Sequence, residues 1–577
     1  MIKRHSLRSP IPSRSSASRA HARRLAITLL LGAALAWSLI PAAAFAQEAA
    51  GASACAALAT KHIAAKLKIT SAHDVPRSAA GESGLAGGSA RDRGPDGAPL
   101  PPLPALPAYC EVSAVITPVP GSRIGVVYRL PEPEHWNGKL LGLGGGGWAG
   151  NVTLRGAAPG LAEGYATAQT DAGHATSSVW DTSWAANRES VVDFSYRAIH
   201  LMTTAGKALV DRYYGHAQSR AYFQGCSTGG RQALMEAQRF PGDYDGIVAG
   251  APVYTLLTQT TGLLRNQAFS APGARLSAAQ LEHLNKAALA ACDAADGAED
   301  GIVTDPRSCK FDPRVLECRS GDSSPDCLSA PQVAAVRAIY AGVKTSDGHV
   351  ASYPLTRGGE AGWSRFLSVE SSPVSRGPGA SEASGASRAS RAAPPGASAN
   401  GGGMGGLRQA LFGDPNFNLD TFNADKDVRI VRTSAFAKLY EADKPDIAPF
   451  LERGGKLILW HGFSDPGPSP LGTIGYYERV RRTTGAQVKT VDSSVRLFLL
   501  PGVYHCGSGP GADRFDSLSA IDQWVAHDQP PENLVATRRD GKLSRPVCAY
   551  PELPYYSGHG NPNDASSFAC RTSPSAH

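Results

Sequence analysis

The sequence predicts a three-layer α/β domain with a second domain inserted into it. Five short apolar runs, each ending at glycine or turn residues, indicate buried parallel strands at residues 139–143, 221–225, 246–251, 456–460 and 495–500. Helical patterns lie between the runs: in residues 194–214, Ile199, Met202, Leu209 and Tyr213 recur on one face at a spacing of about 3.6 residues. Such alternation is typical of a sheet that helices cover on both faces.

The alternation stops between residues 253 and 455, where cysteines cluster, Asp-Gly turns recur and no series of strands is visible. We therefore expect residues 47–252 and 456–577 to form the α/β domain and residues 253–455 to form the insertion. Within the insertion, residues 371–406 consist almost wholly of Ser, Gly, Ala, Pro and Arg. That composition offers too little apolar surface to pack, so this segment is predicted to be flexible.

Composition and charge exclude several classes of protein. The chain has 577 residues, of which 42% are hydrophobic and 19% charged, which argues against a fibrous or wholly disordered protein. The net charge of +7 comes entirely from residues 1–46, which hold seven basic residues and no acidic one. The rest of the chain is neutral, so no nucleic-acid partner is expected.

Residues 1–46 have the pattern of a signal peptide. A basic stretch ends at Arg23-Arg24, an apolar run covers residues 25–40, and Ala44-Phe45-Ala46 offers a small-residue cleavage site. The run is shorter than the ~20 residues that span a bilayer, which makes an uncleaved anchor the weaker alternative. We expect a secreted or periplasmic protein that begins near Gln47 and has no membrane partner. The arginine pair leaves Sec and twin-arginine export both open.

A Gly-x-Ser-x-Gly motif carries the chemistry. Gly225-Cys226-Ser227-Thr228-Gly229 lies between an expected strand and an expected helix, a context in which the sharp turn exposes the serine hydroxyl above the sheet edge. The alternative is an ordinary glycine-rich turn. The flanking strand and helix favour a nucleophile and, with it, the α/β-hydrolase fold.

The expected acid and base follow later strands in the order Ser…Asp…His that this fold uses. Asp465 comes shortly after the run at 456–460, and His505 comes shortly after the run at 495–500. His505 is then the base for Ser227, and Asp465 holds its imidazole tautomer. His461 is the alternative base, but its place beside Asp465 favours a role in holding that loop.

All ten cysteines lie after the proposed cleavage site, which suggests five disulfides in an oxidising compartment. Zinc is the competing interpretation, but no CxxC pair occurs. Nearness along the chain suggests Cys292–Cys309, Cys318–Cys327 and Cys548–Cys570. Cys226 precedes Ser227 and Cys506 follows His505, so a Ser227–His505 hydrogen bond brings these two cysteines within disulfide reach. Cys55–Cys110 remains by elimination.

The glycine-rich run at residues 142–148 follows the first strong strand and predicts an oxyanion hole. Glycines let the backbone approach a substrate carbonyl, and the second donor is expected to be the N–H of Thr228, the residue after the nucleophile. A phosphate-binding loop is the alternative, but neither a Walker A lysine nor GxGxxG is present.

Three motifs together resemble the tannase/feruloyl esterase family: GCSTGG at 225–230, YDGIVAGAP at 244–252 and HCG at 505–507. The likeness runs from about Cys55 to Cys570. It implies Ser227, Asp465 and His505 as the triad, Gly147 and Thr228 as oxyanion donors, and a lid domain inserted into the hydrolase core. It also supports the five disulfides. The segment 371–406 resembles no block of that family.

A short acidic loop between Cys292 and Cys309 predicts a calcium site. Asp293, Asp296 and Asp300 supply hard oxygen ligands, and glycines 297 and 301 supply turns. A pair of plain Asp-Gly turns is the alternative. The resemblance adds the carbonyl oxygens of Ala298 and Ile302 as ligands of one structural Ca²⁺.

These observations predict a secreted serine carboxylic-ester hydrolase of feruloyl esterase or tannase type. Its expected substrates are small esters of hydroxycinnamic (feruloyl) or gallic acid, attached to plant polysaccharide or polyphenol, with Ser227 carrying the acyl group. A hydrolase of mono(2-hydroxyethyl) terephthalate, a serine peptidase and an inactive binding protein are the alternatives. The preferred acid and the oligomeric state stay open. Trp363, Phe366, Phe412 and Phe417 are candidates for lining the pocket.

Overall fold

The computed structural model describes residues 53–81, 101–367, 405–485 and 491–573, apart from residues 177, 320–323, 325, 419, 420 and 533. The expected signal peptide and residues 371–404 lie outside the described residues. Gly405 and Gly406, which we expected to end the flexible segment, begin helix α10 instead, and Gly406 lies against the backbone of Thr182. Ala52–His577 is one unit in its internal contacts.

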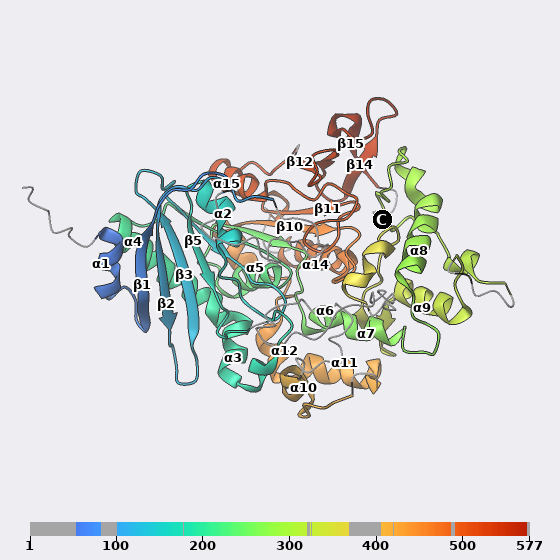
Figure 1. Cartoon of the computed structure of the whole chain (residues 1–577), viewed down its shortest axis with the longest axis horizontal. Helices are drawn as coiled ribbons and strands as arrows, with labels where there is room; N and C mark the ends of the chain where they lie inside the picture. The colour runs from blue at the N-terminus through green and yellow to red at the C-terminus, as the bar shows by residue number, and fades with distance from the viewer. Residues whose placement is uncertain are drawn as a thin grey trace, which may run out of the picture. The chain divides into compact units, whose positions relative to one another are not determined.

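A nine-stranded sheet forms the centre of the fold, in the order β1-β2-β3-β5-β4-β6-β7-β10-β11 (Figure 1). β1 to β3 and β5 pair antiparallel, whereas β5, β4, β6, β7, β10 and β11 run parallel to one another. The strands are β1 (Leu67–Val75), β2 (Tyr109–Ile116), β3 (Ile124–Pro131), β4 (Lys139–Leu143), β5 (Ala166–Thr170), β6 (Arg220–Cys226), β7 (Gly246–Gly250), β10 (Lys456–Gly462) and β11 (Val495–Leu500).

All five predicted parallel strands belong to this sheet, as β4, β6, β7, β10 and β11. Four strands were not predicted. β1 and β2 mix polar with apolar residues, because an antiparallel strand buries one face more than the other, whereas β3 begins with the apolar stretch Ile124–Tyr128, which glycine interrupts. β5 is fully buried, but its sequence ATAQT carries too little apolar bulk to be noticed.

Helices cover both faces of the sheet. On one face, α4 (Ala198–Tyr214), α5 (Thr228–Arg239) and α14 (Pro470–Gly485) bury residues such as Met202, Leu234 and Tyr476 against the strands. On the other face, α15 (Ser517–His527) buries Ile521 and Trp524. The predicted helix at 194–214 is α4, preceded by a π-helical turn at Asp193–Arg197. The remaining helices of the first half are α1 (Ala54–Ala57), α2 (Leu154–Ala162) and α3 (Arg188–Val192).

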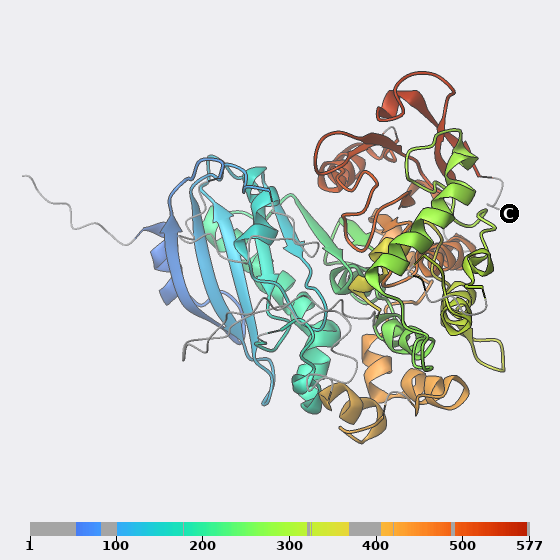
Figure 2. The ribbon, with the colours of Figure 1, turned by 45° about the vertical axis from the view of Figure 1, so that its right-hand side comes forward.

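In its described residues, the chain between β7 and β10 adds no strand to the central sheet. It has a core of its own, in which Trp363 is fully buried. Figures 1 and 2 both show α8 and α9 on the side of the sheet away from β1 to β3. The elements are α6 (Leu256–Gln259), α7 (Thr261–Gln267), α8 (Ala278–Cys292), α9 (Ala330–Ala341), β8 (Val343–Lys344), β9 (Val350–Ser352), α10 (Gly405–Phe412), α11 (Ala424–Thr433), α12 (Ala435–Tyr440) and α13 (Ala448–Glu452).

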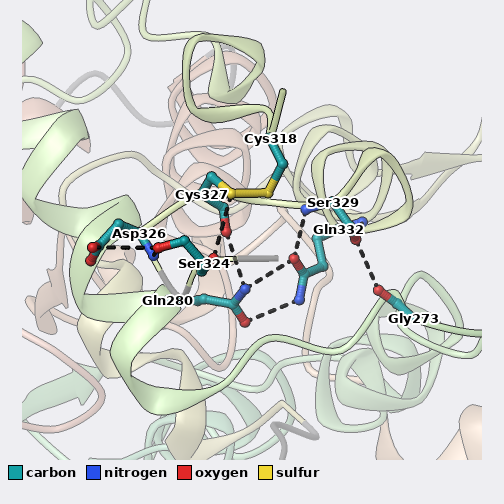
Figure 3. Close-up of a disulfide and its surroundings, with 8 residues drawn as sticks. All are labelled: Gly273, Gln280, Cys318, Ser324, Asp326, Cys327, Ser329 and Gln332. Atoms are coloured by element: carbon teal, nitrogen blue, oxygen red, sulfur yellow. Dashed lines mark hydrogen bonds between the residues drawn. A yellow bond between two sulfur atoms is a disulfide. The ribbon is translucent and has the colours of Figure 1, made fainter. Parts of the chain in front are cut away.

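The first turns of α8 and α9 are tied together beside a disulfide (Figure 3). Ser277 and Ser329 cap these helices through capping boxes with Gln280 and Gln332. The two glutamine side chains also hydrogen-bond to each other, and Gln280 donates to the carbonyl of Cys327 at 3.2 Å. The insertion therefore has a well-connected framework of its own.

After α15, the chain ends in two hairpins, β12 (Leu534–Thr537) with β13 (Ser544–Val547), and β14 (Glu552–Tyr556) with β15 (Phe568–Thr572). All ten cysteines are paired, and the pairs are the five predicted ones: Cys55–Cys110, Cys226–Cys506, Cys292–Cys309, Cys318–Cys327 and Cys548–Cys570. No helix among the described residues is long and apolar enough to cross a membrane.

Candidate active site

Ser227 occupies a strained turn between β6 and α5. Its backbone has φ 62° and ψ −120°, a conformation that costs a non-glycine residue free energy and is found where a side chain must be held outward. The turn is tight because a Cβ on Gly225 would lie 2.5 Å from the backbone of Gly229. Gly225 is therefore required by close backbone contact, and a Cβ on Gly229 would lie only 3.0 Å from the carbonyl oxygen of Gly145.

Three side chains from separate strand ends meet in a chain of hydrogen bonds. Nε2 of His505 lies 2.8 Å from Oγ of Ser227, and Nδ1 of His505 lies 2.7 Å from Oδ2 of Asp465. Asp465 follows β10 and His505 follows β11, so the parallel strands bring both loops to the sheet edge that carries the nucleophile. The structure thus brings together the three residues that the sequence singled out.

A disulfide joins the two loops on either side of the Ser227–His505 contact. The Cα atoms of Cys226 and Cys506 lie 6.0 Å apart, although 280 residues separate them in the chain. Cys506 itself has a positive φ of 57°. The loops of Ser227 and His505 are therefore connected covalently as well as by the hydrogen bond.

The buried carboxylate of Asp465 is strongly compensated. Its Oδ1 accepts the N–H of Gly467 at 2.7 Å, while its Oδ2 faces His505 and also His461. Burial by itself would raise the pKa of Asp465, but the adjacent His505 and the hydrogen bonds from His461 and His505 lower it to about 2. Asp465 is therefore ionised at neutral pH and suited to orient the imidazole of His505.

Arg265 holds the loop of Asp465 from the insertion, and nothing in the sequence indicated this. From α7, its buried guanidinium donates to the carbonyl oxygens of Pro466 and Gly467, and to that of Tyr353 at 3.2 Å. Burial lowers the pKa of Arg265 to about 10, against the attraction of Asp465. No motif pairs Arg265 with the loop of Asp465, unlike the cysteines beside Ser227 and His505, so the sequence carried no signal for this contact.

The glycine-rich loop after β4 leaves one amide group available. The N–H groups of Gly144, Gly145, Gly146 and Trp148 all donate to protein acceptors. Within the described part of the chain, the N–H of Gly147 has no acceptor, and neither has that of Thr228 at the start of α5. Gly147 has φ +58°, and its carbonyl accepts from Oγ1 of Thr228 at 2.5 Å, so the two residues whose N–H groups were predicted as donors are in direct contact.

Of the four aromatic residues considered for the pocket, Phe366 contacts the triad. Its ring meets that of His505 edge to face, with centroids 5.2 Å apart. Trp363 is buried in the core of the insertion, and Phe412 and Phe417 stack on each other.

The acidic loop at 293–302 is folded on its own carboxylates. Asp293 accepts the N–H groups of Gly301 and Ile302, Asp296 accepts that of Ala298, and Asp300 pairs with Arg545. Burial, and then neighbouring aspartates, raise the pKa of Asp296 and Asp300. The three carboxylates are not among the described groups of three whose ligand atoms converge within 4.8 Å, which are Glu132, Glu134 and His135, and His200, Glu236 and Asp243.

Comparison with known proteins identifies the family. The family model described as tannase and feruloyl esterase matches residues 110–571. The chain belongs to this family. A probable feruloyl esterase of Arthroderma benhamiae is 33% identical, over 82% of this chain and 88% of its own. The mono(2-hydroxyethyl) terephthalate hydrolase of Piscinibacter sakaiensis is 32% identical, over 82% and 86%.

A solved structure extends the likeness to the fold. The crystal structure of feruloyl esterase B from Aspergillus oryzae aligns with a TM-score of 0.74 at 26% identity, covering 90% of this chain and all of that one. As a member of the tannase and feruloyl esterase family, the chain is a carboxylic ester hydrolase with an α/β-hydrolase fold.

Proposed function

We propose that the chain is a secreted serine esterase that cleaves esters of aromatic acids through an acyl-enzyme on Ser227. The observation that carries the proposal is the continuous chain of hydrogen bonds from Ser227 through His505 to Asp465, with distances of 2.8 and 2.7 Å.

In the proposed mechanism, Oγ of Ser227 attacks the ester carbonyl while Nε2 of His505 accepts its proton. The N–H groups of Gly147 and Thr228 stabilise the oxyanion of the tetrahedral intermediate. The proton then passes from His505 to the leaving alcohol, and the acyl group stays on Ser227. Water repeats the sequence, with His505 as base, and releases the acid. Asp465 keeps the proton of neutral His505 on Nδ1 throughout.

The relatives point to the substrate class. Feruloyl esterases and a tannin acyl hydrolase share the fold and the family, which supports hydroxycinnamoyl or galloyl esters, attached to plant polysaccharide or polyphenol. The edge of Phe366 against His505 supplies an apolar wall next to the reacting atoms.

The test is the variant Ser227→Ala assayed on methyl ferulate, methyl gallate and mono(2-hydroxyethyl) terephthalate. Turnover of the preferred ester should fall by about 10³-fold or more, because the nucleophile is lost while the oxyanion donors stay. Retained hydrolysis in a folded Ser227→Ala protein would overturn the mechanism. The rank order of kcat/KM that the parent protein shows on the three esters identifies the acid that the enzyme prefers.

We also propose one structural Ca²⁺ in the loop of Asp293, Asp296 and Asp300, with the carbonyl oxygens of Ala298 and Ile302 completing the ligand set. Three carboxylates and two backbone carbonyl oxygens of one loop are the hard oxygen ligands that calcium prefers, and the side chains of Asp296 and Asp300 are buried. In the structure these carboxylates accept N–H groups of the loop and Asp300 pairs with Arg545, so the bound ion would take the place of those donors. The ion would stabilise the loop and take no part in the chemistry.

We also propose that the protein is exported. Residues 1–46 would be removed, and five disulfides fit the oxidising compartment that follows. N-terminal sequencing of protein recovered outside the cytoplasm should begin near Gln47.

A further inference from the structure

A second imidazole shares the carboxylate of Asp465. His461, in β10, is fully buried, and its Nε2 lies 3.0 Å from Oδ2 of Asp465. The same oxygen is 2.7 Å from Nδ1 of His505. His461 has no hydrogen bond to Ser227, so the geometry does not offer it as the base.

The partners of His461 define where its proton lies. Nε2 is also 3.1 Å from the carbonyl oxygen of Pro468, and since a carboxylate and a carbonyl only accept, Nε2 must carry the hydrogen. Nδ1 lies 2.8 Å from Oγ1 of Thr473 on α14, whose hydroxyl can donate to it. A neutral ring with one tautomer satisfies every contact of His461.

The titratable and charged groups that face Asp465 and its loop come from three elements. His461 belongs to β10, His505 follows β11, and Arg265 reaches in from α7 to bind the carbonyl oxygens of the same loop. Because two N–H donors share Oδ2, the carboxylate of Asp465 is restricted in its rotation about the Cβ–Cγ bond. The sharing also limits how strongly that oxygen attracts the proton of His505, because part of its charge is already compensated.

We propose that His461 is a positioning residue of the esterase reaction, which holds Asp465 in the orientation that His505 requires and limits the pull of Asp465 on the protonated ring. The inference rests on the proposed function of Ser227, His505 and Asp465.

The decisive pair of variants is His461→Leu and His461→Gln. Leucine fills a similar volume without a donor, whereas the glutamine amide can place an N–H near the position of Nε2. With methyl ferulate, His461→Leu should lower kcat by about 10- to 100-fold, the usual worth of a hydrogen bond to a charged group, and change KM by less than about threefold. His461→Gln should recover most of the loss.

The pH profile separates positioning from general damage to the fold. Without His461, Asp465 stabilises protonated His505 more strongly, so the acid limb of kcat/KM should move to higher pH by about half a unit or more. General damage to the fold would lower kcat at all pH values and leave the acid limb of the kcat/KM profile at the same pH. Thr473→Val, which removes the partner of Nδ1, should shift the limb in the same direction by less.

Several results would overturn the inference. A folded His461→Leu protein with the parent's kcat and pH profile would do so, as would equal losses in the leucine and glutamine variants with an unmoved limb. If His461→Leu fails to fold by circular dichroism, Thr473→Val decides: an acid limb of kcat/KM at the parent's position would overturn the inference. Hydrolysis that survives Ser227→Ala would instead overturn the proposed function, which keeps the two failures distinct.

Discussion

At the residue scale, the site depends on how one buried carboxylate is compensated. Asp465 is enclosed by protein, yet it stays ionised because its Oδ2 faces two imidazoles and its Oδ1 accepts a backbone N–H. Removal of one partner from such a group leaves a buried charge with fewer donors, which is costly. The triad is therefore supported by groups beyond its three members.

Asp465→Asn should lower kcat on methyl ferulate by about 10³- to 10⁴-fold, because a neutral amide neither holds the tautomer of His505 nor stabilises its protonated form.

The same variant tests how Asp465 contributes to the free energy of unfolding. The pKa of Asp465 is depressed to about 2 in the folded protein, so its ionised form stabilises the fold above its unfolded pKa. That contribution is lost as the pH falls through about 2.

The measurement is urea unfolding of parent and Asp465→Asn between pH 5 and pH 2, with the disulfides intact. The difference in unfolding free energy should shrink by about 2 kcal/mol as the pH falls. A difference that does not change with pH would contradict the assigned state of the carboxylate.

At the element scale, the loops after β6, β10 and β11 are brought together by the parallel sheet and then fixed by cross-links. Cys226–Cys506 joins the first loop to the third, and Arg265 of α7 holds the second. The insertion thus contributes to the catalytic geometry through the loop of Asp465 and through Phe366.

Replacing both Cys226 and Cys506 by alanine should lower kcat/KM on methyl ferulate by about tenfold or more, because loops displaced by even ~1 Å lose reactivity steeply. The melting temperature should fall as well. Alanines at Cys318 and Cys327 are the matched control, since that disulfide lies in the framework of α8 and α9 (Figure 3). Parent-like activity in the first double variant, or equal losses in both, would contradict a specific role for Cys226–Cys506.

At the scale of the whole molecule, distant segments converge on the acidic loop. Asp300 pairs with Arg545 of β13, and Ile302 belongs to the core between the sheet and α15. An ion bound to this loop would stabilise the folded protein by mass action.

EDTA should therefore lower the melting temperature of the parent by a few degrees, and Ca²⁺ added in excess should restore it. Acyl transfer at a temperature below the transition should change little. Asp296→Asn should already melt lower and respond weakly to either treatment. Identical melting curves for the parent with EDTA and with Ca²⁺ would remove the calcium proposal.

The order of residues along the chain was enough to predict five of the parallel strands, the turn of Ser227, the meeting of Ser227 with His505 and Asp465, and all five disulfides. The strands follow from a local pattern, the acid and base from their places after a strand, and the disulfides from nearness, from residues required to meet, or by elimination. Strands β1, β2 and β5 were not predicted because mixed or small-residue segments carry a weak apolar signal, and β3 was not predicted because glycine interrupts its apolar stretch.

Only the tertiary structure decided what surrounds those residues. It placed Arg265 on the loop of Asp465, Phe366 against His505, and Nε2 of His461 on the oxygen that His505 also uses. Such contacts depend on the directions of side chains from elements far apart in the chain. The physical reason is that local spacing specifies elements and turns, whereas the shared partners of a buried charge are set by how those elements pack.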